Sequence, residues 1–67
     1  MNLITPREKE VLQLIAFEHS SKQIASELYV SRETVNSHRK NIMRKLKVKN
    51  VAGMIRVAYE NQLLQTA

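Results

Sequence analysis

The sequence predicts an all-α domain of four short helices, and three observations support this fold class. The chain has 67 residues, with only one glycine and one proline to interrupt helices. Four residues that favour helix N-caps each stand before an apolar run of helical spacing: Thr5, Ser20, Ser31 and Asn50. With 43% apolar residues, the chain is not disordered by composition. A chain this short buries only about 60% of its unfolded surface, so residues 1–67 are expected to form a single domain with a small core.

The first two helices are predicted at residues 6–17 and 21–28. Thr5 can accept from the free amide of Glu8, whose carboxylate can reach back to Thr5, and Pro6 has no amide to leave unpaired. Ser20 precedes Gln23 at the same capping-box spacing. The apolar residues expected to face the core are Val11, Leu12, Leu14, Ile15, Ile24, Ala25 and Leu28.

The third helix is predicted at residues 32–46, where periodicity separates two faces. At about 100° per residue, Val35, Ile42 and Leu46 share one narrow arc, and Met43 lies at its edge. The polar residues on the opposite side are Asn36, Ser37, Lys40, Asn41, Arg44 and Lys47. The stem of Arg39 is expected to pack beside the apolar arc while its guanidinium reaches outward.

The fourth helix is predicted at residues 51–63, after the cap Asn50. Its apolar residues spread over more of the circumference than one core face requires. The surplus is either a surface for a second copy of the chain or the partial exposure that is normal in small domains.

Positive charge is concentrated in residues 31–49. The whole chain carries a net charge of +5, yet this segment holds seven of the eleven basic residues and only one of the six acidic ones. These basic residues are Arg32, Arg39, Lys40, Arg44, Lys45, Lys47 and Lys49. Such a field attracts a polyanion, but a solvated lysine-rich face gives the same pattern, and charge alone does not separate the two.

Several kinds of chemistry have no support in the sequence. There is no cysteine, and His19 and His38 lie far apart, so no metal site is expected. We expect His19 in an exposed loop and His38 as a structural residue. Without a glycine-rich phosphate loop or a nucleophile–base pair, neither an enzyme, a cofactor nor a small-molecule ligand is expected. No apolar run reaches the roughly 18 residues that span a bilayer, and the start lacks the features of a signal peptide.

The second and third helices form a predicted helix-turn-helix unit at about residues 20–39. A short helix, a turn at Tyr29 and Val30, and a capped second helix are typical of this arrangement. The major groove of B-DNA is about 12 Å wide and admits one helix that a partner helix holds in place. Ala25 is small enough to let the two helices approach closely.

The motifs along the chain resemble those of the LuxR/FixJ-type DNA-binding domain of bacterial transcription regulators. They are LITPREKEVLQLIA at the start, SSKQIASELYVS across the turn, ETVNSHRKNIMRKL in the third helix, and KN before a helix ending in LL. The resemblance runs from Leu3 to Leu64. The chain departs from it at Asn36, where many members have lysine, and at Ser21, where asparagine is frequent. It also departs at two positions where glycine is common, Glu18 and Gln62.

The resemblance implies a third helix in the major groove and a fourth helix that pairs two copies on a two-fold operator. It places base contacts at Asn36, Ser37 and Lys40, of which Asn36 can pair in bidentate fashion with adenine and Lys40 with guanine. Phosphate contacts are expected at Lys22, Thr34, Arg39 and Lys45 by resemblance, and at Arg44 and Lys47 from their position along the third helix. The expected dimer interface is Val51, Met54, Val57, Ala58 and Tyr59.

The predicted function is therefore sequence-specific binding of double-stranded DNA in transcriptional regulation, as the effector domain of a cytoplasmic bacterial response regulator. The expected partners are DNA, a second copy of the chain and RNA polymerase. One alternative is a docking module whose basic face meets an acidic protein such as RNA polymerase. RNA is a weaker alternative, because the few aromatic residues (Phe17, Tyr29 and Tyr59) form no stacking platform.

Overall fold

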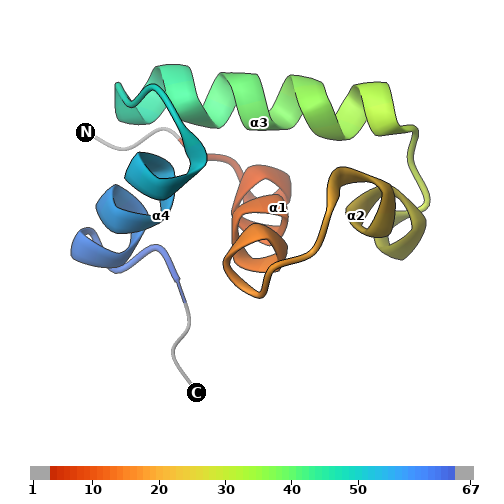
Figure 1. Ribbon diagram of the computed structural model, residues 1–67, viewed down its shortest axis with the longest axis horizontal. Helices are drawn as coiled ribbons and strands as arrows, with labels where there is room; N and C mark the ends of the chain where they lie inside the picture. Colours follow the sequence, from red (N-terminus) through yellow and green to blue (C-terminus); the bar gives the residue numbers. More distant parts are fainter. Residues whose placement is uncertain (1–3, 65–67) are drawn as a thin grey trace.

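The computed structural model describes residues 4–64 and contains four helices in that range. They are α1 (Pro6–Ala16), α2 (Ser21–Leu28), α3 (Arg32–Leu46) and α4 (Val51–Glu60). Figure 1 shows α3 running across one side of the molecule, with α4, α1 and α2 on its other side. Because α3 packs against each of the other helices, it connects the parts of the domain. The prediction of an all-α fold with four helices is confirmed, and no strand occurs between residues 4 and 64.

The helix starts lie where the capping residues predict them. Each N-cap side chain accepts a hydrogen bond, at 2.8 to 3.1 Å, from the backbone N–H three residues later: Thr5, Ser20, Ser31 and Asn50. In α1 and α2 a second bond completes the capping box. The Glu8 carboxylate accepts from the Thr5 N–H at 3.0 Å, and the Gln23 side-chain oxygen accepts from the Ser20 N–H at 2.7 Å. These bonds satisfy amides that the first helical turn leaves unpaired.

All four helices are followed by a residue with a left-handed backbone conformation, which the residue types at these positions do not predict. After each helix one residue adopts the left-handed conformation, and none of these residues is glycine: Glu18 (φ 67°), Tyr29 (59°), Lys47 (59°) and Gln62 (60°). The N–H of the following residue then donates back into the helix at 2.8 to 3.0 Å, as in a Schellman motif. Three of these following residues, Val30, Val48 and Leu63, pack on the core. Their burial offsets the roughly 1–2 kcal/mol that a side chain costs in this conformation.

The fourth helix is shorter than the predicted 51–63. It ends at Glu60 because Gln62 turns the chain and the Leu63 N–H donates to the Ala58 carbonyl at 2.8 Å. Leu63 is thereby buried against the core, although it lies beyond the helix. The first helix likewise ends one residue early, at Ala16, and exposed Phe17 is its C-cap.

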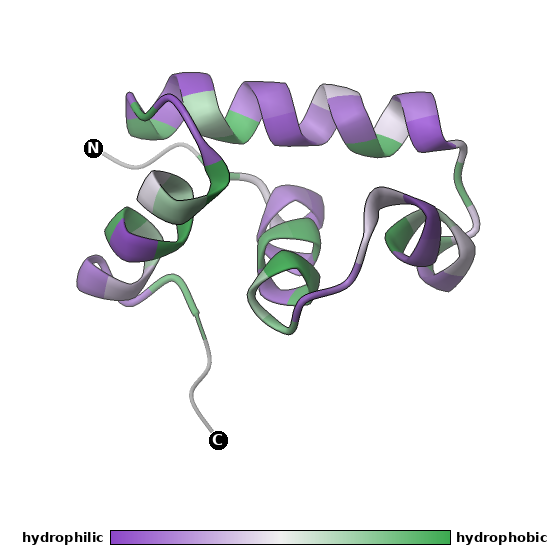
Figure 2. Cartoon of the chain, in the orientation of Figure 1, coloured by the Kyte–Doolittle hydropathy of each residue, from purple (hydrophilic) through white to green (hydrophobic). Residues whose placement is uncertain are grey.

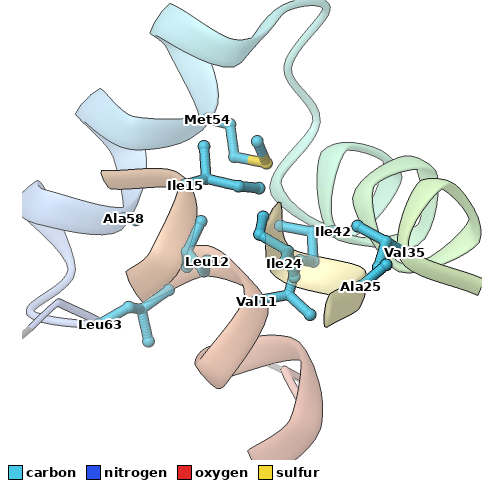
Figure 3. Close-up of a cluster of buried hydrophobic side chains, with 10 residues drawn as sticks. All are labelled: Val11, Leu12, Ile15, Ile24, Ala25, Val35, Ile42, Met54, Ala58 and Leu63. Atoms are coloured by element: carbon cyan, nitrogen blue, oxygen red, sulfur yellow. The ribbon is translucent and has the colours of Figure 1, made fainter. Parts of the chain in front are cut away.

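The core is built from all four helices (Figure 3). Its fully buried side chains are Val11, Leu12, Ile24, Val35, Ile42, Met54 and Ala58. Three of the residues expected in the core, Leu14, Leu28 and Leu46, are half-buried at its edge. Gly53 allows the chain before α4 to approach this helix, since a Cβ there would lie 3.3 Å from the Cβ of Val48. Burying each large apolar side chain stabilises the fold by about 1.5–3 kcal/mol.

Candidate nucleic-acid interface

The outer face of α3 carries a row of exposed polar side chains. Asn36, Ser37 and Lys40 are all exposed, whereas Val35 and Ile42 on the opposite face are fully buried. Figure 2 shows α3 as a largely hydrophilic helix. We refer to Asn36, Ser37 and Lys40 as the polar row. The fold leaves this row directed away from the core, which is the orientation that a base-reading surface requires.

The start of α3 is held by α2 and the turn between them. Tyr29 ends α2 in the left-handed conformation, and the Val30 N–H donates to the Ala25 carbonyl at 3.0 Å. The side chains of Ile24, Ala25 and Val35 are buried together in the corner between the two helices. This is the short helix, turn and long helix of the predicted helix-turn-helix unit.

One member of the polar row is bonded to α2. The Ser21 hydroxyl donates to the Oδ1 atom of Asn36 across a distance of 3.0 Å. Ser21 is the first residue of α2 and is half-buried, while Asn36 is exposed. These residues lie 15 positions apart, so no local pattern predicts that they pair, although both are positions where the chain departs from the LuxR/FixJ-type pattern.

The residues predicted to contact phosphate do not all have the same environment. Lys22, Thr34, Arg44 and Lys47 are exposed, and Arg39 is half-buried beside the core face. Lys22 is the second residue of α2, so it lies in the first turn, at the positive end of the helix dipole. The Thr34 hydroxyl is 2.9 Å from the Ser31 hydroxyl and thus takes part in the cap of α3.

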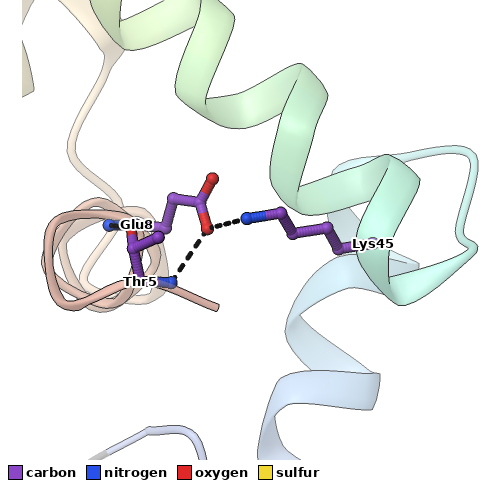
Figure 4. A network of polar contacts seen from close by, with 3 residues as sticks. All are labelled: Thr5, Glu8 and Lys45. Atoms are coloured by element: carbon purple, nitrogen blue, oxygen red, sulfur yellow. Dashed lines mark hydrogen bonds and ion pairs between the residues drawn. The ribbon is translucent and has the colours of Figure 1, made fainter. Parts of the chain in front are cut away.

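Lys45 differs from the other basic residues of α3 because it forms an ion pair with α1. Its Nζ atom lies 2.7 Å from the Glu8 carboxylate, whose same oxygen accepts the Thr5 N–H (Figure 4). The Glu8 side chain is only 6% exposed and that of Lys45 is 23% exposed. A phosphate contact by Lys45 would therefore have to share or displace this ion pair.

The charge state of Glu8 follows from these contacts. Burial raises the pKa of its carboxyl group, but the hydrogen bond from Lys45, the Thr5 N–H and the positive charge of Lys45 together outweigh burial and place the pKa below its usual value. Glu8 is therefore ionised at neutral pH. The sequence predicts only the capping role of Glu8, because no local pattern indicates its second partner, Lys45, 37 residues away.

Basic residues outside residues 31–49 are partly neutralised within their own helices. Arg7 pairs with Glu10 at 3.4 Å, and Arg56 pairs with Glu60 at 3.3 Å. Both pairs are exposed and contribute little stability, but they reduce the net charge away from α3. The excess of positive charge therefore lies in residues 31–49.

Two residues of the predicted dimer interface lie in the core instead. Met54 and Ala58 are fully buried within a single copy of the chain and have no surface to offer a second one. The prediction is wrong for these two because helical spacing does not tell which apolar residues of a helix face its own core. Val51 and Tyr59, which are exposed, and Val57, which is half-buried, remain accessible on α4.

Both histidines are half-buried. His19 was expected in an exposed loop, but it is half-buried, and its Nδ1 atom is buried without a hydrogen-bond partner in the part of the chain that the structure describes. His38 is half-buried on α3. Among residues 4–64, no group of three or more acidic, histidine or cysteine side chains could hold a metal ion. In the same range no helix has the length and apolar character needed to cross a bilayer.

Comparison with known proteins agrees with this arrangement. Residues 2–58 match the family model described as bacterial regulatory proteins, luxR family. The chain is 49% identical over 57 residues to the uncharacterized response regulatory protein YgeK of Escherichia coli strain K12, covering 85% of this chain and 39% of YgeK. It is 49% identical over 47 residues to the spore germination protein GerE of Bacillus subtilis strain 168, covering 70% of this chain and 64% of GerE.

A solved structure of the transcription factor GerE is similar over nearly the whole length of both chains. Its TM-score is 0.90 at 32% sequence identity, and the match covers 97% of this chain and 97% of that one. The sequence alignments cover a smaller share of the curated relatives: 64% of GerE, 39% of YgeK and 28% of the transcriptional regulatory protein MctR of Rhizobium johnstonii, so this chain spans less than half the length of YgeK and MctR.

The sequence match and the fold therefore agree with each other. Four capped helices, a helix-turn-helix unit and a basic third helix are what a DNA-binding domain of this kind needs. Domains of this family bind double-stranded DNA in transcription regulation. The chain belongs to the luxR family of bacterial regulatory proteins.

Proposed function

We propose that this domain recognises a specific DNA sequence by inserting α3 into the major groove, and that two copies pair through α4 on a two-fold operator. In this role it serves as the DNA-binding part of a transcription regulator that acts in the bacterial cytoplasm. The observation that carries the proposal is the polar row, which is exposed on the outer face of a helix whose inner face is fully buried.

Base contacts by the polar row would supply sequence discrimination. A helix that enters the groove must present side chains with hydrogen-bonding groups and must itself be held rigidly. Asn36, Ser37 and Lys40 meet the first condition. The buried corner of Ile24 and Val35 meets the second, since it fixes α3 against α2.

Phosphate contacts would supply most of the affinity. Lys22, Arg44 and Lys47 are exposed and can neutralise phosphates, which releases the counterions that surround DNA. Lys22 is well placed for this role, because the unpaired amides at the start of α2 also favour an anion. Thr34 and Arg39 are weaker candidates, and Lys45 would have to share its contact with Glu8.

Pairing through α4 would double the contact with DNA. Val51, Val57 and Tyr59 form the accessible apolar part of this helix. A two-fold pair reads two half-sites whose centres lie about one helical turn, or 34–36 Å, apart. The operator should therefore be close to a palindrome.

Selection of bound duplexes from a random pool tests the proposal. The selected duplex and a scrambled control are then titrated with the domain at several salt concentrations. We expect enriched sequences with two-fold symmetry, tighter binding to the selected duplex, and affinity that falls linearly with the logarithm of salt concentration. Equal binding to both duplexes at every salt concentration would contradict sequence-specific recognition and favour the docking of RNA polymerase or another acidic protein.

A further inference from the structure

The hydrogen bond between Ser21 and Asn36 limits what Asn36 can read. An asparagine amide has one acceptor atom, Oδ1, which carries two lone pairs, and one donor group, Nδ2. Bidentate pairing with adenine needs both at once, because Nδ2 donates to adenine N7 while Oδ1 accepts from the N6 amino group. In this structure Oδ1 is directed at the Ser21 hydroxyl, 3.0 Å away on α2. The bond uses one lone pair of Oδ1 and turns this atom toward α2, so bidentate pairing with a base edge would compete with it.

We infer that Ser21 is a positioning residue that makes Asn36 a hydrogen-bond donor toward DNA, so that this position selects guanine or thymine over adenine and cytosine. The inference rests on the proposed function and specifies its base preference. In the major groove guanine presents the acceptors O6 and N7 and thymine presents O4, whereas cytosine presents a donor and adenine a donor beside its acceptor. A free Nδ2 group fits the acceptor edges best.

The bond is in place before DNA binds, because packed elements hold both partners. Ser21 follows Ser20, whose side chain and N–H are both used in the capping box of α2. Asn36 follows Val35, which is fully buried against α2. Rotating the amide so that Oδ1 leaves Ser21 would lose an existing bond, and this cost favours the orientation in which Nδ2 faces the DNA.

Two lysines of the proposed interface, Lys40 and Lys22, also present hydrogen-bond donors. Lys40 lies one turn after Asn36 on the same face and carries only donors. Lys22, next to Ser21 at the start of α2, is also a donor. A surface rich in donors matches a stretch of groove rich in acceptors, so we expect guanine at the base pair that Lys40 contacts.

The test compares base preferences of the wild-type domain and of variants at position 21. Asn36→Ala first identifies the base pair that Asn36 reads, as the one whose preference is lost. Competition between duplexes that differ only at this base pair then measures the order of the four bases. The wild-type domain should prefer guanine or thymine there, and Ser21→Ala should improve binding to the adenine duplex about fivefold or more, because Oδ1 becomes available for bidentate pairing.

Ser21→Thr is the matched control, since it keeps the hydroxyl group and should keep the wild-type order of bases. A loss of fold in Ser21→Ala would weaken binding to all four duplexes alike, so a change confined to one base pair reports orientation of the amide. The inference is overturned if the wild-type domain prefers adenine at this base pair, if Ser21→Ala leaves the order unchanged, or if Asn36→Ala weakens all sequences equally. Absence of any sequence preference in the wild-type domain would instead remove the proposed function itself.

Discussion

The two halves of α3 are attached to the rest of the domain in different ways. In the N-terminal half, Asn36 is joined to α2 by an exposed hydrogen bond from Ser21. In the C-terminal half, Lys45 is joined to α1 by a largely buried ion pair with Glu8. Exposed polar bonds contribute little stability because water competes for both partners, but they can still orient a side chain. The bond in the N-terminal half can orient a side chain of the proposed interface, whereas the ion pair in the C-terminal half stabilises the packing of α3 on α1.

Removing the amine of Lys45 should produce the largest loss of stability. Lys45→Met leaves the buried Glu8 carboxylate without its cation, and breaking such a pair at one partner costs about 3–5 kcal/mol when both groups are fully buried. Since Lys45 is 23% exposed, we expect a decrease of about 2 kcal/mol in the free energy of unfolding, measured by urea titration.

Lys49→Met is the matched control, because Lys49 is exposed and belongs to the same basic segment. Its effect on stability should stay within about 0.5 kcal/mol. An equal effect of the two substitutions would mean that the ion pair does not fix the C-terminal half of α3.

Lys40→Ala should weaken DNA binding without changing stability, whereas Lys45→Met should lower stability. We expect binding to the selected duplex to weaken by about 1–3 kcal/mol and discrimination at one base pair to be lost, with the free energy of unfolding unchanged because Lys40 is exposed. Titration of duplexes that differ at single base pairs measures both effects. A uniform loss on all sequences would make Lys40 a phosphate contact.

Lys22→Ala provides the comparison for that outcome. As a phosphate contact, Lys22 should support binding to every sequence similarly. Its removal should lower the slope of log affinity against log salt by about one. An unchanged slope would place Lys22 outside the interface.

Acid should lower the free energy of unfolding by protonating Glu8, which then loses its ion pair with Lys45. The pKa of Glu8 lies below its usual value in the folded domain, so between the folded and unfolded pKa values the unfolded chain binds more protons. The stability that Glu8 contributes is therefore complete above the unfolded pKa, about 4.3, and is lost as pH falls through the lower, folded pKa. Glu8→Gln keeps a capping side chain but cannot ionise, so its free energy of unfolding should fall less steeply than that of the wild type below about pH 5. Parallel curves would show that Glu8 does not have the lowered pKa.

The sequence predicted the helix starts and the outer face of α3 well, because both depend on local chemistry. A capping side chain and its amide lie three residues apart, and the polar row follows from helical periodicity. Contacts between distant residues have no such local signal. The partnership of Glu8 with Lys45 and that of Ser21 with Asn36 exist only once the helices pack.

The residues at the helix ends and on α4 show the same limit. Glu18 and Gln62 adopt a conformation that glycine favours. Because neither residue is a glycine, the sequence does not indicate that α1 and α4 end just before them. The assignment of Met54 to a dimer interface failed because the core required that residue. Periodicity predicts that a helix has an apolar face, but packing decides which apolar residues the core uses.

The smallest predicted effect concerns the junctions that bound α3 at its two ends. Tyr29 and Lys47 both have φ 59°, and the Tyr29 side chain is 95% exposed, so replacing it removes no packing. Tyr29→Gly relieves about 1–2 kcal/mol of left-handed strain but makes the unfolded chain more flexible by about 0.5–1 kcal/mol. We expect a net gain of about 0.5 kcal/mol in the free energy of unfolding, measured by urea titration, with base preference unchanged.

Tyr29→Ala keeps the left-handed strain and should gain no stability. An equal gain in both variants would show that the backbone conformation is not the cause. Lys47→Gly should give a similar gain, since its backbone has the same φ and its side chain is also exposed.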